Sequence, residues 1–254
     1  MKFHTILIIL VLSFSSFALD FYQEAIHWGF IGFMGAGTYA FSQTKPFFNE
    51  PIFDVSTNSP LAKTEISPGI FYLSTSAITG LVFLAPVKQL ERDNALLIKY
   101  NHIKGFVAAT AATSMLTGFS KDLFGISRPD ADARINSDYS ERHTRDSFPS
   151  GHSSFAFCNA TYSALYLWKH VGDNNMSWTL AKTTTTASLI AGATAVACSR
   201  VDKRHHRTSD VVTGAFLGGA VAVGTFILQE NHSGKLENIS LEATSSGIAI
   251  TWRF

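Results

Sequence analysis

The chain has 254 residues, of which 46% are apolar and only 15% are charged, and its formal net charge at pH 7 is +1. This length and composition suit one domain with a large apolar core. The sequence has seven prolines and no charge run, low-complexity segment or internal repeat of fixed period, which argues against a long disordered linker. We expect no nucleic-acid partner, and the sequence specifies no oligomeric state.

The N-terminal segment has the pattern of an export signal. Lys2 precedes an uncharged apolar stretch from Thr5 to Phe17, and Ala18 completes a site with the small residues that a signal peptidase reads. We therefore predict a signal peptide over residues 1–18 and an exported protein of the cell envelope, located in the periplasm and able to associate with the membrane. An uncleaved membrane anchor is the alternative.

Six apolar segments follow the signal, and each has the composition of a helix. They cover about residues 25–41, 66–87, 105–120, 153–168, 183–198 and 211–228. The predicted fold class is all-α, a helical bundle of about six core helices that occupies residues 19–232. A membrane span needs about 20 mostly apolar residues, and only the segment 211–228 looks like one by itself.

The two cysteines, Cys158 and Cys198, fall in the fourth and fifth of these segments. An oxidising compartment would permit a disulfide between them. Buried free thiols would instead serve as small apolar side chains, and the sequence leaves both readings open.

The residues after 232 change character. Ile248, Ile250, Trp252 and Phe254 alternate with smaller or polar residues, which is the period of a strand. A turn at 245–247 would let this strand pair with residues 239–244. We therefore predict a C-terminal tail over 233–254 that contains a small β-hairpin.

Three polar blocks lie at the ends of apolar segments. Their sequences are KDLFGISRP at 121–129, PSGH at 149–152 and SRVDKRHHRTSD at 199–210. They contain three cations, Lys121, Arg128 and Arg200, which suit a dianion that needs several donors at once. They also contain His152 and His206, a pair that suits a reaction needing both a nucleophile and a proton donor.

The order and spacing of these blocks resemble the signature of the type 2 phosphatidic acid phosphatase superfamily, which also holds bacterial class A acid phosphatases and vanadium haloperoxidases. Every signature position is filled, in the form Lys-x6-Arg-Pro, Pro-Ser-Gly-His and Ser-Arg-x5-His-x3-Asp. The resemblance implies a helical bundle and a phosphatase that hydrolyses phosphomonoesters without a metal or cofactor. The substrate would be a phosphorylated lipid or a small soluble ester, and the intermediate a phosphohistidine.

The resemblance also implies roles for the histidines. His206 would attack phosphorus, and Asp210 would accept the other ring N–H, because residues four apart share a face of a helix. His205 is a competing nucleophile, but it lies five residues from Asp210 and breaks this spacing. His152 would protonate the leaving alkoxide and then activate water, a role worth about 10²- to 10⁴-fold in rate.

The remaining signature residues would bind the phosphoryl group. Lys121, Arg128 and Arg200 would hold its equatorial oxygens, where charge must be stabilised during transfer. Ser150 and Gly151 lie immediately before an apolar helix, so their backbone N–H groups could point at the anion. A side chain at Gly151 would hinder the approach of the backbone.

The loop 130–147 between the first two blocks is polar and mixed in charge, and we expect it to form the rim of the substrate mouth. Its basic side chains could contact a head group, although a solvated loop is the favoured reading. These side chains are Arg134, Arg142, His143 and Arg145.

The membrane topology follows from the resemblance, because members of this family with integral helices carry the site on the outer side. With a cleaved signal and six spans, the motif blocks would instead face the cytoplasm. We therefore favour a helical bundle in the periplasm. An integral membrane protein whose site faces outward is the alternative.

Other functions are weighed against the phosphatase. A vanadate-dependent haloperoxidase would use the same cations and histidine, but those enzymes are generally longer. A non-catalytic protein that binds phosphate or a lipid head group would have no need of a nucleophile and an acid. A metal site is disfavoured because its candidate ligands fit no familiar zinc spacing and include no cysteine; they are His143, His152, His205 and His206.

Overall fold

The computed structural model describes the backbone of residues 2–48, 50, 60, 69–137, 141–236, 239–244 and 247–252, and the side chains of residues 23–48, 50, 60, 77–137 and 143–231. Long helices dominate it, and the prediction of an all-α helical bundle is confirmed for the described part of the chain. The long helices are α1 (Lys2–Gln43), α2 (Gly69–Leu84), α3 (Ala95–Phe124), α6 (Gly151–His170), α7 (Met176–Asp202) and α8 (Thr208–Leu236).

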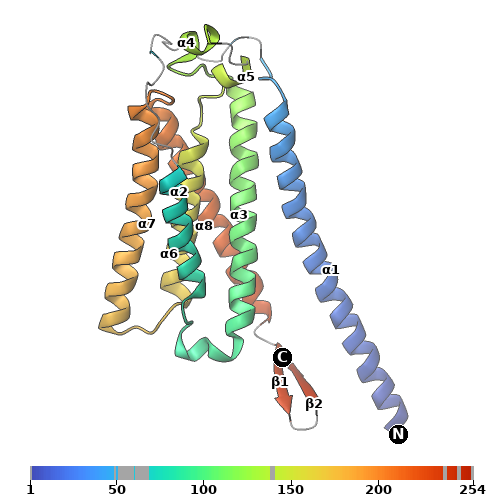
Figure 1. Cartoon of the computed structure of the whole chain (residues 1–254). Helices are drawn as coiled ribbons and strands as arrows, with labels where there is room; N and C mark the ends of the chain where they lie inside the picture. The colour runs from blue at the N-terminus through green and yellow to red at the C-terminus, as the bar shows by residue number, and fades with distance from the viewer. Residues whose placement is uncertain are drawn as a thin grey trace.

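Each long helix contains most or all of one predicted apolar segment, and successive long helices run in opposite directions along the bundle (Figure 1). Two short helices, α4 (Ala131–Ile135) and α5 (Glu141–Thr144), lie at one end. A 3-10 helix, η1 (Gln89–Asn94), precedes α3 at the other end. Near the C-terminus, β1 (Ile239–Thr244) and β2 (Gly247–Trp252) pair antiparallel.

The first helix differs from the expected organisation. α1 runs without a break over 42 residues. The predicted cleavage site after Ala18 therefore lies inside a helix that also contains the first predicted core segment. The signal peptide itself stays a prediction.

α6 is the centre of the bundle, because it packs against α2, α3, α7 and α8. Its Tyr162 and Tyr166 are fully buried among aromatic rings of three neighbouring helices. The ring of Tyr166 lies 4.7 Å from that of Phe83 on α2, and the ring of Tyr162 lies 5.7 Å from Phe106 on α3 and 5.5 Å from Phe226 on α8. Burial of such rings supplies much of the stability of a core.

Two glycines let α8 approach the N-terminal half of α6. A Cβ on Gly218 would lie 1.9 Å from the backbone oxygen of Ser154, and a Cβ on Gly214 would lie 2.5 Å from that of Ser150. Real side chains do not tolerate such distances, so the helices could not pack this closely with alanine at either position. The close approach sets the first turns of α6 and α8 side by side.

We expect Gly218→Ala to destabilise the fold by about 1–3 kcal/mol, because the added methyl group would force α8 away from the α6 backbone. Gly224→Ala is the matched control, since no atom among the described residues lies within 4 Å of its added Cβ. At position 224, replacing a helical glycine with alanine should raise the free energy of unfolding by up to about 1 kcal/mol. Thermal unfolding under identical conditions measures both variants, and an equal response would contradict the close-packing argument.

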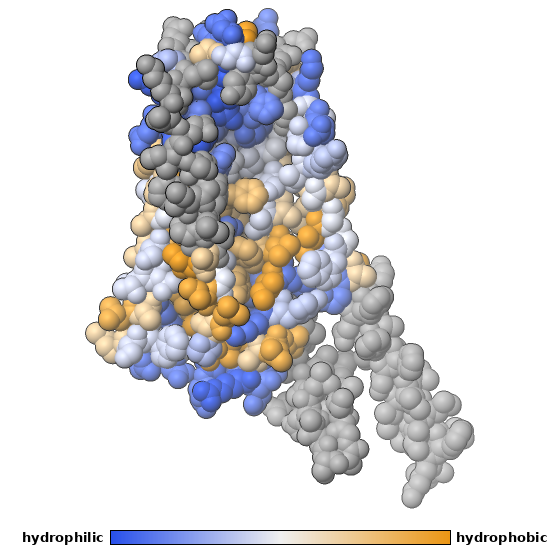
Figure 2. Space-filling model, in the orientation of Figure 1, coloured by the Kyte–Doolittle hydropathy of each residue, from blue (hydrophilic) through white to orange (hydrophobic). Residues whose placement is uncertain are grey.

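The surface of the long helices is unusually apolar. Figure 2 shows apolar side chains gathered between two hydrophilic ends. Large apolar side chains that are more than half exposed include Phe30, Phe33, Leu81, Leu84, Val212 and Phe216. In the part of the chain that the structure describes, Thr208–Asn231 is long and apolar enough to cross a membrane, judged by length and composition alone.

Candidate active site

The three motif blocks converge at the end of the bundle where α4 and α5 lie. Lys121 belongs to the last turn of α3, His152 to the first turn of α6 and Arg200 to the last turn of α7. His206 lies in the turn before α8, and Arg128 in the loop after α3. The fold thus gathers charged groups from segments that are far apart in the sequence.

The backbone ties the second and third blocks together. The carbonyl oxygen of Arg200 accepts the N–H groups of His205 and His206 at 3.1 and 3.2 Å. The N–H of Ser150 donates to the carbonyl oxygen of Asp210 at 2.9 Å, and the hydroxyl of Ser153 donates to that of Val211 at 2.6 Å. These bonds fix the turn that carries His206 beside the N-terminus of α6.

The prediction that the backbone N–H of Ser150 binds an anion is therefore wrong, because this N–H already donates to the carbonyl oxygen of Asp210. Ser150 instead caps α6, where its hydroxyl accepts the N–H of Ser153. The N–H groups of Gly151 and His152 belong to the first turn and have no carbonyl four residues earlier within the helix. They are the backbone donors that the helix end offers to an anion.

Gly151 is not required by packing. A Cβ there would meet only the Thr117 methyl group among the described residues, at an ordinary 3.6 Å. The predicted need for glycine would therefore have to come from a bound anion and not from the protein around it.

The ring of His206 is buried and held in one tautomer. Its Nδ1 lies 2.7 Å from the carbonyl oxygen of Ser147. A carbonyl only accepts hydrogen bonds, so Nδ1 carries the proton and Nε2 keeps its lone pair. This is the protonation pattern that a nucleophilic imidazole needs.

Asp210 has a different contact from the predicted one. α8 begins at Thr208, so His206 and Asp210 do not share a helical face, and the carboxylate lies 3.7 Å from Nδ1, too far for a direct hydrogen bond. It accepts the Ser147 hydroxyl at 2.6 Å and the N–H of Arg207 at 2.9 Å. Asp210 therefore orients the segment that carries the His206 acceptor and adds a nearby negative charge.

The carbonyl oxygen of His205 accepts from Arg128 at 3.1 Å, but its imidazole makes contacts with another part of the chain. Its Nδ1 lies 3.1 Å from the carboxylate of Asp130 and 2.9 Å from the guanidinium of Arg134, and Arg134 in turn donates to Asp130 at 2.8 Å. These contacts attach His205 to α4. The geometry thus favours His206 over His205 as the nucleophile.

The expectation of a solvated rim is wrong for two of its basic side chains. Arg134 and Arg145 are each only 9% exposed. Arg145 donates to the backbone oxygens of Gly125 and Phe48 at 3.3 and 3.0 Å. Both guanidinium groups stabilise the loop, because a planar guanidinium can donate hydrogen bonds to several acceptors at once.

Sequence reasoning missed Asp146. Its carboxylate accepts from Nε of Arg128 at 2.5 Å and lies 3.5 Å from Nζ of Lys121. Burial alone would raise its pKa, but the positive charges of Lys121 and Arg128 hold the pKa of this carboxyl far below its usual range. A carboxylate therefore sits on two cations predicted to bind phosphate. In the sequence it was one of several acids in a polar loop.

We expect Asp146→Asn to tighten the inhibition by inorganic phosphate about tenfold, because a dianion would no longer compete with a carboxylate for Lys121 and Arg128. The inhibition constant for phosphate measures this effect. Asp132→Asn is the control, since Asp132 is an exposed acid on the neighbouring α4. Weaker inhibition in Asp146→Asn would show instead that the carboxylate holds the cations in their binding positions.

Burial in this site lowers the pKa of His152 and of His206, which favours the neutral form of both rings. Burial, then the charge of Arg200 and the neighbouring His206, lower the pKa of His152 to about 3. Burial lowers the pKa of His206 to about 4, against the opposing effect of Asp210. A neutral His206 suits attack on phosphorus. His152 needs a proton, and a bound phosphate dianion would favour its charged form.

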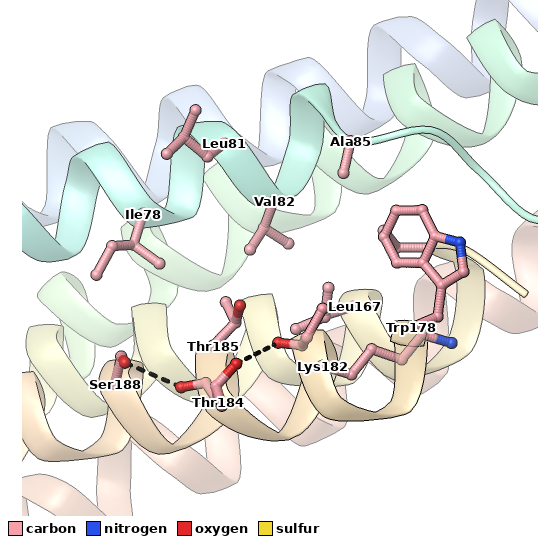
Figure 3. Close-up of a pocket in the computed structure, with 12 residues that line it drawn as sticks. Ile78, Leu81, Val82, Ala85, Leu167, Trp178, Lys182, Thr184, Thr185 and Ser188 are labelled. Atoms are coloured by element: carbon pink, nitrogen blue, oxygen red, sulfur yellow. Dashed lines mark hydrogen bonds between the residues drawn. The ribbon is translucent and has the colours of Figure 1, made fainter. Parts of the chain in front are cut away.

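Outside this site, a cavity of about 320 Å³ lies between α2, α6 and α7 (Figure 3). It is lined mainly by apolar side chains such as Ile78, Leu81 and Leu167, together with the stem of Lys182. None of its lining residues belongs to a motif block.

The two cysteines are free, Cys158 buried and Cys198 exposed, so the hypothesis of a disulfide between them is not supported.

Comparison with known proteins finds similarity over a stretch of the chain that contains all three blocks. Residues 103–233 match the family model described as the PAP2 superfamily. A "PA-phosphatase related-family protein" of Dictyostelium discoideum is 30% identical over 197 residues, which cover 72% of this chain and 69% of that protein. "Lipid phosphate phosphatase 1" of Arabidopsis thaliana is 38% identical over 76 residues, 30% of this chain and 23% of that protein. No solved structure matches the chain significantly.

Proposed function

The chain belongs to the PAP2 superfamily, and on this premise we propose that it is a metal-independent phosphatase that hydrolyses a phosphomonoester through a phosphohistidine. The observation that carries the proposal is the fixed tautomer of His206. Its Nδ1 proton is bonded to Ser147, which leaves the Nε2 lone pair for phosphorus. Simple binding of a phosphate would not need this arrangement.

The first step joins Nε2 of His206 to phosphorus and breaks the bond between phosphorus and the leaving oxygen. Lys121, Arg128 and Arg200 would stabilise the charge on the equatorial oxygens. His152 would give its proton to the leaving alkoxide, which departs as an alcohol. The carboxylate of Asp146 would first have to move away from Lys121 and Arg128, so that these cations can bind the substrate.

The second step breaks the bond between phosphorus and His206 and releases inorganic phosphate. His152, now neutral, would take a proton from water as that water attacks phosphorus. This step restores the protonated acid and the free nucleophile. Three fixed cations supply the positive charge that a metal ion brings in other phosphoryl-transfer sites.

We infer a phosphorylated lipid as the substrate class. The apolar surface of the long helices would be covered by lipid, since so many large apolar side chains would be costly in water. The hydrophilic end of the bundle with the motif blocks would then lie at the membrane surface, where a lipid head group is found. The relative named as a lipid phosphate phosphatase supports the same class.

The continuous α1 supports the alternative topology, in which this helix is an uncleaved anchor. The long helices alternate in direction, so the motif blocks and the N-terminus of α1 belong to opposite ends of the bundle (Figure 1). An N-terminus on the inner side would place the site on the outer side. Resistance of the protein to carbonate extraction would support this topology, and release by carbonate would favour the bundle that only rests on the membrane.

The test of function is phosphate release by the purified protein from phosphatidic acid, phosphatidylglycerol phosphate, undecaprenyl pyrophosphate and a soluble aryl phosphate, with chelator present. We expect activity that survives EDTA and is inhibited by vanadate, which mimics the transition state of phosphoryl transfer. A requirement for an added divalent ion would contradict the metal-independent mechanism. Preference for the soluble ester would contradict the inferred lipid class.

A further inference from the structure

A second cluster of chemically reactive side chains lies far from the motif blocks. It consists of His102 on α3, His170 at the end of α6 and Glu230 on α8. His102 and Lys121 share α3, and nineteen residues at 1.5 Å per residue separate them by about 28 Å along the helix axis. The cluster therefore belongs to the opposite end of the bundle and has no part in the proposed phosphatase chemistry.

The three side chains converge on one point. Nε2 of His102 lies 3.0 Å from Oε1 of Glu230, and Nε2 of His170 lies 2.5 Å from the same oxygen. One ligand atom from each residue lies within 4.8 Å of the others. His102 is fully buried and His170 is 6% exposed. Two imidazoles and a carboxylate are the donor set that zinc and its neighbours in the first transition row prefer.

The far side of each imidazole is also held. Nδ1 of His170 lies 2.9 Å from a carboxylate oxygen of Glu91, and Nδ1 of His102 lies 3.3 Å from the hydroxyl of Tyr162. In metal sites such partners fix the ring and direct the opposite nitrogen at the ion. Both rings here present Nε2 to the shared centre and Nδ1 to an outer partner.

One nitrogen of the cluster has no satisfactory hydrogen bond. Nε2 of His102 is buried and, despite its 3.0 Å separation from Glu230, makes no hydrogen bond of acceptable geometry with any described residue. A buried polar atom in this condition costs stability. A bound cation would satisfy it, since the lone pair would then coordinate the ion and the Nδ1 proton would bond to Tyr162.

We propose that His102, His170 and Glu230 bind one divalent transition-metal ion, zinc in the first instance, that joins α3, α6 and α8 at this end of the bundle. Tetrahedral zinc with bonds of about 2.0–2.1 Å separates neighbouring ligand atoms by about 3.3 Å. The two separations from Glu230 are 2.5 and 3.0 Å, and all the ligand atoms lie within 4.8 Å of one another, so modest side-chain shifts would bring them to that value. A water molecule would complete the coordination. The ion is structural, and it is independent of the phosphatase site.

The experiment uses the full chain, purified with a tag that contains no histidine. Metal content is measured by mass spectrometry after loading with zinc and removal of the excess. We expect about one zinc ion per chain in the wild type and less than a tenth of that in His102→Gln and Glu230→Gln. His206→Ala is the matched control, because it removes a buried histidine of the other site and should keep its zinc.

A second measurement guards against variants that fail to fold. Glu91→Gln leaves all three ligands in place and removes only the partner of His170, so it should fold and bind zinc about 10- to 100-fold more weakly. Zinc should also raise the thermal midpoint of the wild type and not that of Glu230→Gln. Cobalt in place of zinc should give the visible absorption of a tetrahedral site in the wild type alone.

The proposal is overturned if the zinc-loaded wild type holds no metal and shows no thermal shift. That result would identify the cluster as a buried hydrogen-bonded contact between helices. Zinc retained by both His102→Gln and Glu230→Gln would overturn it as well. Phosphate release by metal-free Glu230→Gln keeps the two claims separate, because that variant should lose the ion and keep the proposed chemistry.

Discussion

Replacing His206 with asparagine is expected to abolish turnover, with a loss in kcat of about 10⁴-fold or more, because the reaction would lose its nucleophile. The buried imidazole keeps Nδ1 bonded to Ser147, so Nε2 is the atom that attacks. Asparagine retains a polar group near Ser147 and should leave the fold intact. Initial rates of phosphate release, together with binding of vanadate or phosphate by the same variant, would separate lost chemistry from lost binding.

The matched control is His205→Asn. His205 is equally buried and adjacent in the sequence, but it contacts Asp130 and Arg134 of the α4 region. We expect this variant to keep kcat within about tenfold of the wild type and to unfold at a lower temperature, since a buried contact is weakened. Rapid quenching with labelled substrate should trap phosphate on His206. Label recovered on His205 would overturn the assignment of the nucleophile.

His152→Asn should impair turnover by about 10²- to 10⁴-fold for an alkyl or lipid ester and much less for an aryl phosphate. An alkoxide is a poor leaving group and needs the proton of His152, whereas an aryl oxide leaves readily without it. The position of His152 in the first turn of α6, beside Arg200 and His206, suits a group that works next to the phosphoryl oxygens. Ratios of kcat for the two ester types in both proteins give the result.

The control for His152→Asn is Ser154→Ala, which changes the same helix two residues further on and leaves every residue of the motif blocks in place. Ser154 donates to the Ser150 carbonyl oxygen at 3.0 Å, so its loss should affect stability and not the leaving-group preference. Equal losses on both ester types in His152→Asn would remove this residue from the acid role. It would then have to act by holding the anion.

Local sequence patterns were enough to predict the helices and to propose the residues of the site. Apolar segments of helical length predicted six long helices, and the order of Lys121, Arg128, His152, Arg200 and His206 predicted phosphate chemistry. Both rest on local patterns, because the period of apolar residues and the spacing of a motif can be read without knowing which segments touch. Membership in the PAP2 superfamily is confirmed by the same central residues.

Which of these groups meet depends on how the helices and loops pack. The spacing of His206 and Asp210 predicted a hydrogen bond across one helical face, but α8 begins too late for that face to form. The carboxylate lies 3.7 Å from Nδ1, and the carbonyl oxygen of Ser147 bonds to His206 instead. Asp146 became part of the site only when the loop returned to Lys121 and Arg128.

The same holds at the other end of the bundle, where His102, His170 and Glu230 are separated by 60 or more residues and meet because three helices pack together. The sequence specifies the chemistry of a side chain and its position on a helix. The residues that this side chain contacts depend on how the helices cross. That crossing is set here by close contacts such as Gly218 against the α6 backbone.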